Sequence, residues 1–387
     1  MNILIVNGHL MVGGVEKSLV DLLKSIDYSK HKVDLLLFEG YGELAAQVPE
    51  EVHVILCDLT PTYGSFFEAI KKSIANRDWR SVFLKIIFTL SSNCGVKFIS
   101  LMRLLKITPG EYDCAIAYRI GICADYVGYA VKAKKKMVWW HHGEFNYEES
   151  QVNRWRKTSL KMDNIVCVSE ATKTLITPHF PEKAADIVVV PNMIIQKEII
   201  EKSQVFHPYG KADKRILVSV GRMSPEKHMI DAVYAMEKLV DMGYSNLIWY
   251  LIGDGSERER IEKEISDKKL DGKIVCTGTL ENPYPYIADA DLFVHPSYVE
   301  SQGLTVLEAF ALGKTCVVTR SLGVEEFVVD GKNAFLAEQS IQSLTEKIDF
   351  ALTEENCAVL DKEFQKETVK RFSQKHIVES VMQLAER

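Results

Sequence analysis

Short apolar runs alternate with longer amphipathic stretches along the whole chain, which is typical of parallel sheets covered by helices. In the first half, seven apolar runs predict strands at 3–7, 33–38, 52–56, 113–118, 136–140, 164–168 and 187–190. The second half repeats the rhythm with six more, at 215–220, 247–252, 273–277, 291–295, 315–318 and 334–336. The alternation predicts an α/β protein with two doubly wound, Rossmann-like domains.

The boundary between the two domains is expected where this rhythm is interrupted. The dipeptide Pro191-Asn192 ends one predicted strand, and the residues that follow are mostly polar up to the next strand. We therefore place a hinge near 192–213, with an N-terminal domain over 1–192 and a C-terminal domain over 193–370. A chain of 387 residues exceeds what one hydrophobic core usually organises, so a cleft between two domains is expected.

The composition narrows the functional class. Apolar residues make up 47% of the chain and charged residues 26%, as in globular proteins rather than disordered ones. The net charge of −6 gives no global attraction to nucleic acid, so an anionic ligand needs locally placed donors. Eight scattered cysteines without a Cys-x-x-Cys pair indicate buried thiols in a reducing compartment. Without a signal sequence or a run of about 18 apolar residues, a cytoplasmic protein is expected.

The segment 79–110 is both apolar and basic. It contains no acidic residue and five basic ones, namely Arg80, Lys85, Lys97, Arg103 and Lys106. Such a pattern is typical of helices that lie on an anionic membrane surface. It fits equally well two helices that cover the core and leave a solvated basic face. The sequence is compatible with both interpretations.

Two carboxylates, Glu300 and Glu308, follow the predicted strand 291–295. Glu308 lies within an apolar stretch, from Leu304 to Leu312, that predicts a buried helix. A carboxylate buried there without a partner would cost several kcal/mol, so it should meet a ligand hydroxyl, a cation or a backbone donor. The diol of a ribose is a suitable ligand.

The residues between these carboxylates suit a diphosphate. Gly303 allows close approach of the backbone, and the N–H groups of Leu304 and Thr305 lie at the positive end of the predicted helix. Glu300, one loop earlier, can then reach a second set of hydroxyls. The alternative is that Glu308 pairs with a structural arginine and that Glu300 is a surface residue. The complete Glu-x7-Glu pattern after a strand favours the ligand-binding interpretation.

Together with three other segments, these residues resemble the retaining GT-B glycosyltransferases, in particular family 4 (glycosyl transferases group 1). The other segments are Gly221-Arg222-Met-Ser-Pro-Glu-Lys227, Gly253-Asp-Gly-Ser256 and Gly278-Thr-Leu280. The resemblance extends over nearly the whole chain. It implies a GT-B fold, in which two Rossmann-like domains face a central cleft. We further expect residues 371–387 to form a helix that packs back on the N-terminal domain.

Arg222 and Lys227 are the candidates for binding a diphosphate. They bracket a turn in which Ser224 is a suitable N-cap and Pro225 the first helical residue, so both cations are expected beside a helix N-terminus. Two basic residues at this spacing are often only a solvated loop, but the resemblance implies that they neutralise the donor diphosphate. Connecting loops often have only a structural role, yet the resemblance also implies donor contacts from Gly221, Gly253, Thr279 and Leu280.

In the N-terminal half, two features are candidates for contact with the reacting groups. Gly13-Gly14 precedes an amphipathic helix and lets the backbone approach a ligand, although its spacing does not fit a nicotinamide-binding motif. His141 and His142 end an apolar strand, where the resemblance implies a histidine near the donor sugar. We favour His142 as the catalytic residue, because a glycine follows it, and expect donor contacts from Gly14 and His141. A metal site is disfavoured, because neighbouring strand residues point to opposite faces and no third ligand is near.

Two residues differ from those that are common at the same positions in the family. Gln302 stands where an aromatic residue is common, and Ala334 stands where a second glycine is common. These departures leave the identity of the sugar open. Ser301 and Gln302 are the residues expected to contact it.

The sequence therefore predicts a retaining glycosyltransferase that needs neither a metal ion nor a cofactor. The expected donor is a UDP-sugar, and the expected acceptor is a saccharide or a lipid-linked saccharide. The expected role is bacterial surface polysaccharide synthesis, such as capsule formation, in the cytoplasm or at the inner face of the membrane. The expected catalytic residues are Arg222, Lys227, Glu300 and His142.

Two alternatives belong to other classes. A non-hydrolysing UDP-sugar epimerase resembles this two-domain fold and would convert UDP-GlcNAc without any acceptor. A non-catalytic partner subunit would keep the fold alone, because fold does not fix function. The intact Arg222, Lys227, Glu300 and Glu308 argue against a partner subunit.

Overall fold

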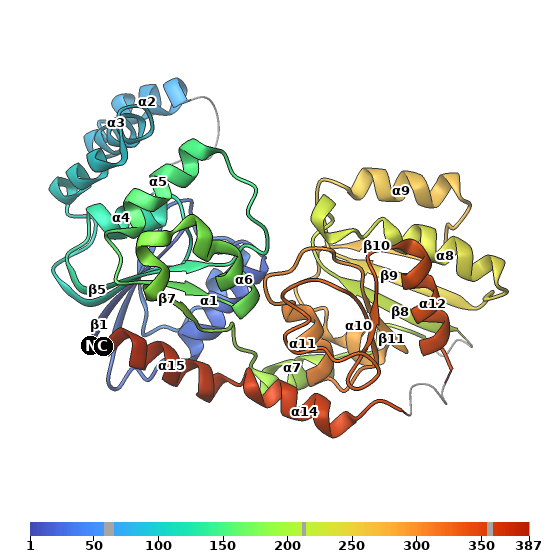
Figure 1. Cartoon of the computed structure of the whole chain (residues 1–387). Coiled ribbons are helices and arrows are strands. Elements are labelled where there is room, and N and C mark those ends of the chain that lie inside the picture. Colours follow the sequence, from blue (N-terminus) through green and yellow to red (C-terminus); the bar gives the residue numbers. More distant parts are fainter. Residues whose placement is uncertain (58–65, 211–213, 354–358, 387) are drawn as a thin grey trace. The chain divides into compact units, whose positions relative to one another are not determined.

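The computed structural model describes residues 1–57, 66–210, 214–353 and 359–386 of the chain. It contains two compact units (Figure 1). Unit 1 comprises Met1–Met193 and Gln374–Arg387, and unit 2 comprises Ile194–Ser373. Each unit is a parallel sheet with flanking helices, which confirms the predicted α/β fold with two doubly wound domains.

The sheet of unit 1 has the strand order β3-β2-β1-β4-β5-β6-β7, and every neighbouring pair is parallel. Its strands are β1 Asn2–Asn7, β2 Lys32–Leu37, β3 His53–Leu56, β4 Tyr112–Ala117, β5 Ala133–Trp140, β6 Asn164–Cys167 and β7 Ile187–Val189. Along β1, Ile3 and Ile5 enter one core and Leu4 and Val6 the other, because successive side chains of a strand point to opposite faces.

Helices cover both faces of this sheet. The core that contains Ile3 and Ile5 is closed by α1 (Gly14–Ser25) and by the last helix, α15 (Gln374–Glu386). The core that contains Leu4 and Val6 is closed by α3 (Trp79–Asn93), the 3₁₀ segment η2 (Val96–Leu105) and α4 (Ile122–Tyr129). The remaining elements are η1 Glu43–Gln47, α2 Phe66–Ala75, α5 Glu149–Ser159, α6 Glu170–Ile176, η3 Thr177–His179 and η4 Pro181–Asp186.

The sheet of unit 2 is also parallel, with the strand order β10-β9-β8-β11-β12-β13. Its strands are β8 Arg215–Val220, β9 Leu247–Ile252, β10 Ile274–Gly278, β11 Leu292–His295, β12 Cys316–Thr319 and β13 Phe335–Ala337. One core lies under α8 (Asp231–Asp241), α9 (Arg258–Asp267) and α12 (Ile341–Ala351). The other lies under α7 (Gln196–Ser203), α10 (Tyr284–Asp289), α11 (Leu304–Ala311) and α14 (Lys362–Arg371).

The chain passes between the units twice, after Met193 and after Ser373. Most of the expected hinge, 192–213, belongs to unit 2, because α7 packs against α10 and α11. Residues 211–213 of that stretch lie outside the described part. The last helix begins at Gln374 rather than at 371, and it packs against α1 within unit 1 (Figure 1).

Both sheets have a point where the strand order reverses direction. In unit 1 this point lies between β1 and β4, and in unit 2 it lies between β8 and β11. In open α/β sheets, ligands bind outside the carboxyl ends of the strands at such a switch point. The loops that follow these four strands are therefore the places to look for a site.

The segment 79–110 folds mainly as α3 and η2, which pack on the core of unit 1 through residues such as Leu84, Ile87 and Met102. Lys85, counted among the five basic residues, is buried and donates to the Ser73 hydroxyl at 3.2 Å. It does not contribute to a basic surface. Of the described helices, none is long and apolar enough to cross a membrane.

The cysteines do not all follow the predicted burial. Five of those described are buried, Cys276 is partly buried and Cys94 is exposed. Cys357 lies outside the described residues. No disulfide joins two of the described cysteines.

Candidate functional site

At the switch point of unit 2, two segments are tied together by backbone hydrogen bonds. β8 leads into the segment 221–227, and β11 leads into the loop 296–303. The carbonyl oxygen of Glu226 accepts hydrogen bonds from the N–H groups of Tyr298 (3.2 Å) and Val299 (3.4 Å). The side chains of both segments are therefore held next to one another.

The helix start predicted beside Arg222 and Lys227 is only a single 3₁₀ turn. This turn, η5 (Pro225–Lys227), has three residues, and the next α-helix begins at Asp231. Ser224 occupies the N-cap position, but its hydroxyl donates to the Glu226 carboxylate at 2.7 Å instead of capping the turn. Ser224 and Pro225 thus occupy the predicted N-cap and first helical positions, but the helix is one 3₁₀ turn, too short to supply the dipole of an α-helix. An anion bound here has to be held by the cationic side chains themselves.

The segment that carries Arg222 rests on the backbone of a glycine turn. A Cβ atom on Gly253 would lie 1.9 Å from the Gly221 carbonyl oxygen, and one on Gly255 would lie 2.3 Å from that of Met223. The Met223 N–H group donates to the Asp254 carbonyl at 2.8 Å. Gly253 has φ +140°, a conformation that side chains other than glycine rarely adopt. The turn around Gly253 thus supports the cationic segment through close backbone packing.

A hydrogen-bond network surrounds Glu300. Lys227 Nζ donates to Glu300 Oε1 at 2.7 Å, and His295 Nε2 lies 2.8 Å from the same oxygen. Because a carboxylate only accepts hydrogen bonds, Nε2 carries the hydrogen of this pair. The other ring nitrogen of His295, Nδ1, lies 3.4 Å from the Thr305 hydroxyl. The side chains of His295 and Glu300 are only 4% and 10% exposed, so water competes little for these contacts.

The surrounding groups keep Glu300 ionised. Burial raises the pKa of its carboxyl, but the charge of Lys227 and the hydrogen bonds from His295 and Lys227 outweigh burial and hold that pKa well below its ordinary value. Both hydrogen bonds that the described residues make to this carboxylate reach Oε1. Oε2 is therefore left to accept hydrogen bonds from a ligand.

Arg222 differs from Lys227 in that its side chain has no hydrogen-bond or ion-pair partner among the described residues. That side chain is exposed. Lys227 is ion-paired with Glu300, yet its side chain is still 21% exposed. The site therefore presents one free guanidinium and one ammonium that an anion can draw away from a carboxylate.

The loop from Glu300 to the start of α11 depends on two glycines. Gly303 is the N-cap of α11 with φ +78°, and a Cβ atom on it would lie 2.5 Å from Val324 Cγ1. A Cβ atom on Gly323 would lie 2.4 Å from the carbonyl carbon of Ser301. Within α11, the N–H groups of Leu304 and Thr305 belong to the first turn and have no acceptor in the helix. Gln302 is buried, with 2% exposure, and Ser301 is partly exposed.

Glu308 is buried on α11, as predicted, with 4% exposure. Its Oε1 accepts a hydrogen bond from the Tyr284 hydroxyl at 3.1 Å. On the neighbouring loop after β10, Thr279 is exposed and Leu280 is partly buried against the same core as Tyr284. Tyr284 is a neutral donor to this carboxylate, in contrast to the cation that holds Glu300.

In unit 1, the two histidines after β5 differ in environment. His142 is exposed and packs edge-on against Trp140 and Tyr147. His141 Nε2 is buried, and the described residues provide no hydrogen-bond partner for it. Burial, together with the nearby His142 and Arg119, lowers the pKa of His141 to about 3. His141 is therefore a neutral imidazole at physiological pH.

The start of α1 is already occupied by a carboxylate. A Cβ atom on Gly13 would lie 2.5 Å from Glu16 Oε2, and Gly14 has no atom near its Cβ position. Glu16 is buried and forms a short ion pair with Arg119, which follows β4. His9 Nδ1 lies 3.8 Å from the same carboxylate. The absent side chain of Gly13 thus makes room for Glu16, which the sequence did not single out.

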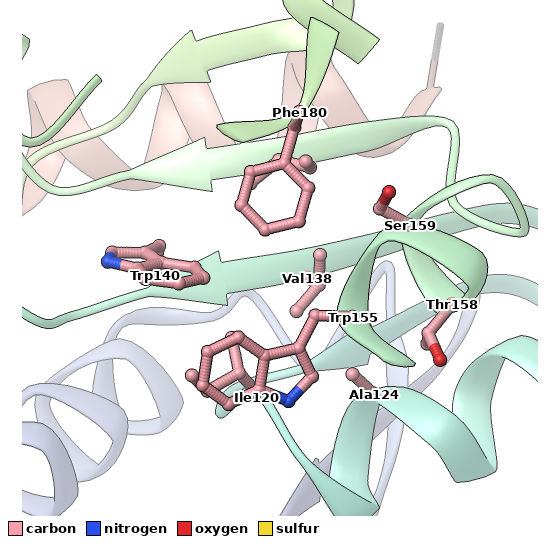
Figure 2. Close-up of a pocket in the computed structure, with 9 residues that line it drawn as sticks. Ile120, Ala124, Val138, Trp140, Trp155, Thr158, Ser159 and Phe180 are labelled. Carbon is pink, nitrogen blue, oxygen red and sulfur yellow. The ribbon is translucent and has the colours of Figure 1, made fainter. Parts of the chain in front are cut away.

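Unit 1 also contains an apolar cavity beside β5 (Figure 2). Trp140 from β5, Trp155 from α5 and Phe180 line it. Trp140 also stacks on Phe145, with ring centroids 5.6 Å apart, and Phe145 stacks on His179 at 3.6 Å. These aromatic contacts fix the loop that follows His142.

Two family models match this chain, one in each half. Glycosyltransferase Family 4 matches residues 12–196, and glycosyl transferases group 1 matches residues 201–373. The chain belongs to glycosyltransferase family 4. This result confirms the resemblance that the sequence motifs indicated.

This family 4 chain matches curated relatives over only part of the relatives' length. The lipopolysaccharide core biosynthesis glycosyltransferase LpsE of Rhizobium meliloti is 32% identical over 127 residues, which cover 33% of this chain and 36% of LpsE. The N-acetyl-alpha-D-glucosaminyl L-malate synthase of Bacillus anthracis is 27% identical over 228 residues, covering 56% of this chain and 58% of the synthase. The match thus spans from about a third to under two thirds of these relatives.

A similar solved structure is that of HepE from Anabaena in complex with UDP-glucose. It aligns with a TM-score of 0.74 at 18% identity and covers 99% of this chain and 98% of HepE. At this identity the likeness establishes the fold alone. Together with the two parallel sheets, it confirms the predicted GT-B architecture.

Within unit 2 of this family 4 chain, the structure brings together Lys227 and Glu300 and adds His295, which the sequence did not single out. It also adds Tyr284 beside Glu308. His295 could have been found as an ionisable residue at the end of a buried strand. Tyr284 could not have been found in this way, because its hydrogen bond to Glu308 joins α10 to α11, which are separate in the sequence.

Proposed function

We propose that this chain is a glycosyltransferase that moves a sugar from a UDP-sugar to a saccharide or lipid-linked saccharide, with retention of the α configuration and without a metal ion. The observation that carries this proposal is the pair of cations at the unit 2 switch point, the free Arg222 and the exchangeable Lys227, beside the ionised Glu300. An arrangement of cations and hydroxyl-accepting carboxylates suits a nucleotide diphosphate joined to a sugar.

In this proposal the donor binds unit 2. Its diphosphate is bound by Arg222, Lys227 and the N–H groups of Leu304 and Thr305, which have no acceptor within α11. Its ribose hydroxyls donate to Glu308, and its sugar hydroxyls donate to Oε2 of Glu300. Supporting contacts come from Gly221, Ser301, Thr279 and Leu280. Gln302 and Gly253 have a packing role, because one is buried and the other lies against backbone.

The transfer breaks the bond between the anomeric carbon and the β-phosphate oxygen and forms a bond from that carbon to the acceptor oxygen on the same face. The acceptor hydroxyl passes its proton to a leaving phosphate oxygen. Negative charge builds on the departing diphosphate, so Arg222 and Lys227 stabilise the transition state more than the ground state. No side chain is assigned as a nucleophile.

Unit 1 is proposed to bind the acceptor and to supply a histidine. We infer that His141, rather than His142, accepts a hydrogen bond from a sugar hydroxyl, because its Nε2 is unpartnered among the described residues and its ring is neutral. The His142 ring packs beside Trp140 and Tyr147, which suits a role in shaping the loop.

The test measures UDP release from UDP-glucose, UDP-GlcNAc and UDP-galactose with lipid-linked acceptors. Each charge-assisted phosphate contact is worth about 1.5–3 kcal/mol, so the double variant Arg222→Ala with Lys227→Ala should lose roughly two to four orders of magnitude in turnover. Lys238→Ala, an exposed lysine of α8, serves as the control and should behave as wild type.

Further measurements test metal independence and the configuration of the product. Turnover should persist in EDTA, and NMR of the product should show an α linkage. Equal turnover in wild type and the double variant would refute the mechanism. Conversion of UDP-GlcNAc without any acceptor would instead indicate an epimerase, and UDP-sugar binding without turnover would indicate a non-catalytic partner subunit.

We also propose that α3 touches an anionic membrane surface, which would place the enzyme at the inner face of the bacterial membrane for capsule or other surface polysaccharide synthesis. Trp79, Phe83 and Ile86 are 64%, 39% and 42% exposed and lie on one face of this helix. Arg80 of the same helix is exposed, as are Lys97 and Lys106 in and after η2. The basic residues supply the charge complementarity that such a surface requires.

Vesicle co-sedimentation tests this contact. Binding to phosphatidylglycerol vesicles should exceed binding to phosphatidylcholine vesicles, and it should fall in the variant Arg80→Glu with Lys97→Glu and Lys106→Glu. Arg103 is left unchanged because its Nε donates to the Ala130 carbonyl. If the variant with all three Glu substitutions still co-sediments with the vesicles, α3 and η2 only cover the core.

A further inference from the structure

The Lys227–Glu300 ion pair creates a conflict that the proposed reaction has to resolve. Without a ligand, Lys227 Nζ lies 2.7 Å from Glu300 Oε1. A diphosphate carries more negative charge than a carboxylate and competes for the same ammonium. When Lys227 turns to the diphosphate, Glu300 loses its cationic partner and one of the two hydrogen bonds that fix it.

His295 is the group that remains. It lies at the end of β11, a strand of the sheet, whereas Glu300 belongs to the loop that follows. Its Nε2 lies 2.8 Å from the same Oε1 that Lys227 contacts, so Oε2 stays available for a ligand. The imidazole side chain is 4% exposed and its ring is nearly parallel to that of Phe293, at a centroid distance of 6.4 Å.

The ring orientation is set from its other side. Thr305 Oγ1 lies 3.4 Å from His295 Nδ1. With Nε2 donating to Glu300, a neutral ring leaves Nδ1 as the acceptor for the Thr305 hydroxyl. The chain Thr305, His295 and Glu300 therefore joins the first turn of α11 to the sugar-facing carboxylate without using Lys227.

We propose that His295 is a positioning residue for the donor sugar: it holds the Glu300 carboxylate in place when Lys227 is drawn to the diphosphate. This inference rests on the proposed function, since it assigns His295 to the same donor site. His295 touches neither the sugar nor the diphosphate. Its removal should affect ligands that contain the sugar and spare those that contain only the nucleoside diphosphate.

The experiment compares His295→Leu, which removes the donor at similar volume, with His295→Gln, whose side-chain amide restores an N–H donor. Calorimetry measures binding of UDP and of the UDP-sugar that the wild type turns over best, and initial rates give kcat and KM. In His295→Leu, UDP affinity should stay within about twofold of wild type while kcat/KM for the UDP-sugar falls roughly tenfold to a hundredfold. His295→Gln should recover much of that loss.

Two results would overturn the proposal. One is wild-type kcat/KM in His295→Leu, and the other is a parallel loss of UDP and UDP-sugar affinity that Gln does not repair, which would make His295 a general structural residue. His207→Leu, an exposed histidine of unit 2, is the matched control and should change nothing. Failure of the proposed function is distinguishable, because it would appear in the Arg222 and Lys227 double variant whatever the His295 variants do.

Discussion

Replacing Gly253 with alanine tests whether the backbone packing under the cationic segment matters for the site. The new Cβ atom would lie 1.9 Å from the Gly221 carbonyl oxygen, where atoms of this kind need at least 3.0 Å. The carbonyl belongs to backbone and cannot swing away like a flexible side chain. The chain at Gly221 or at Gly253 therefore has to retreat by more than an ångström, and Arg222 is the next residue.

The cost can be worked out from two contributions. Alanine at a positive φ costs roughly 1–2 kcal/mol by itself. Displacing the backbone also strains two hydrogen bonds of 3.0 Å, from Gly253 N–H to the Gly278 carbonyl and from Gly221 N–H to the Ile252 carbonyl. With an overpacking cost of about 1–3 kcal/mol, which includes this strain, Gly253→Ala should lose roughly 2–5 kcal/mol in the free energy of unfolding of unit 2.

Gly243 offers a matched control. It lies in the same unit with φ +101°, and nothing is within 4 Å of its Cβ position. Gly243→Ala therefore carries the conformational cost without the overlap and should lose only about 1–2 kcal/mol. Urea unfolding gives the free energies, and calorimetry with UDP should show a loss of affinity in Gly253→Ala alone. Equal stability of the two variants, with unchanged UDP binding in both, would refute the packing argument.

Other predictions concern the two carboxylates. Lys227→Ala should destabilise the protein at pH 7 by about 2 kcal/mol, because Glu300 keeps only the hydrogen bond from His295. The pKa of Glu300 is lowered by folding, so this stabilisation exists above its unfolded value of 4.5 and is lost as the pH falls below it. The stability gap between wild type and Lys227→Ala in urea unfolding should accordingly stay constant from pH 7 to about pH 5 and narrow as the pH falls further, and a gap that stays constant down to about pH 3 would contradict the assigned cause. Glu308→Gln should weaken UDP binding about tenfold while leaving pyrophosphate binding unchanged in calorimetry, whereas a parallel loss of both would remove Glu308 from the ribose.

The strands could be predicted from the sequence because parallel strands buried on both faces are continuous apolar runs. All thirteen predicted strands are present, and the differences lie at their ends. β5, for example, begins at Ala133. The sequence predicted a start at 136, because Lys134 and Lys135 are not apolar. Pairing of Ala133 with Tyr112 of β4 extends the strand instead.

The local details of the site were less predictable. Ser224-Pro225 has the composition of a helix start, but His228 adopts φ +47° and ends the turn after three residues. Lys85 was assigned to a basic face because of its charge, yet helix α3 places it inward, against Ser73. In both cases the outcome depends on tertiary neighbours that no local pattern encodes.

The two carboxylates that mark the site have different physical roles because their surroundings differ. Glu300 lies on a loop and is held by Lys227 and His295, so a diphosphate bound as proposed would change its environment directly. Glu308 lies inside α11, where it is buried and accepts a hydrogen bond from the neutral hydroxyl of Tyr284. A carboxylate with an exchangeable cation suits the part of a donor that reacts. A carboxylate buried within a helix suits the part that stays bound, so sugar transfer should depend on Glu300 and nucleotide affinity on Glu308.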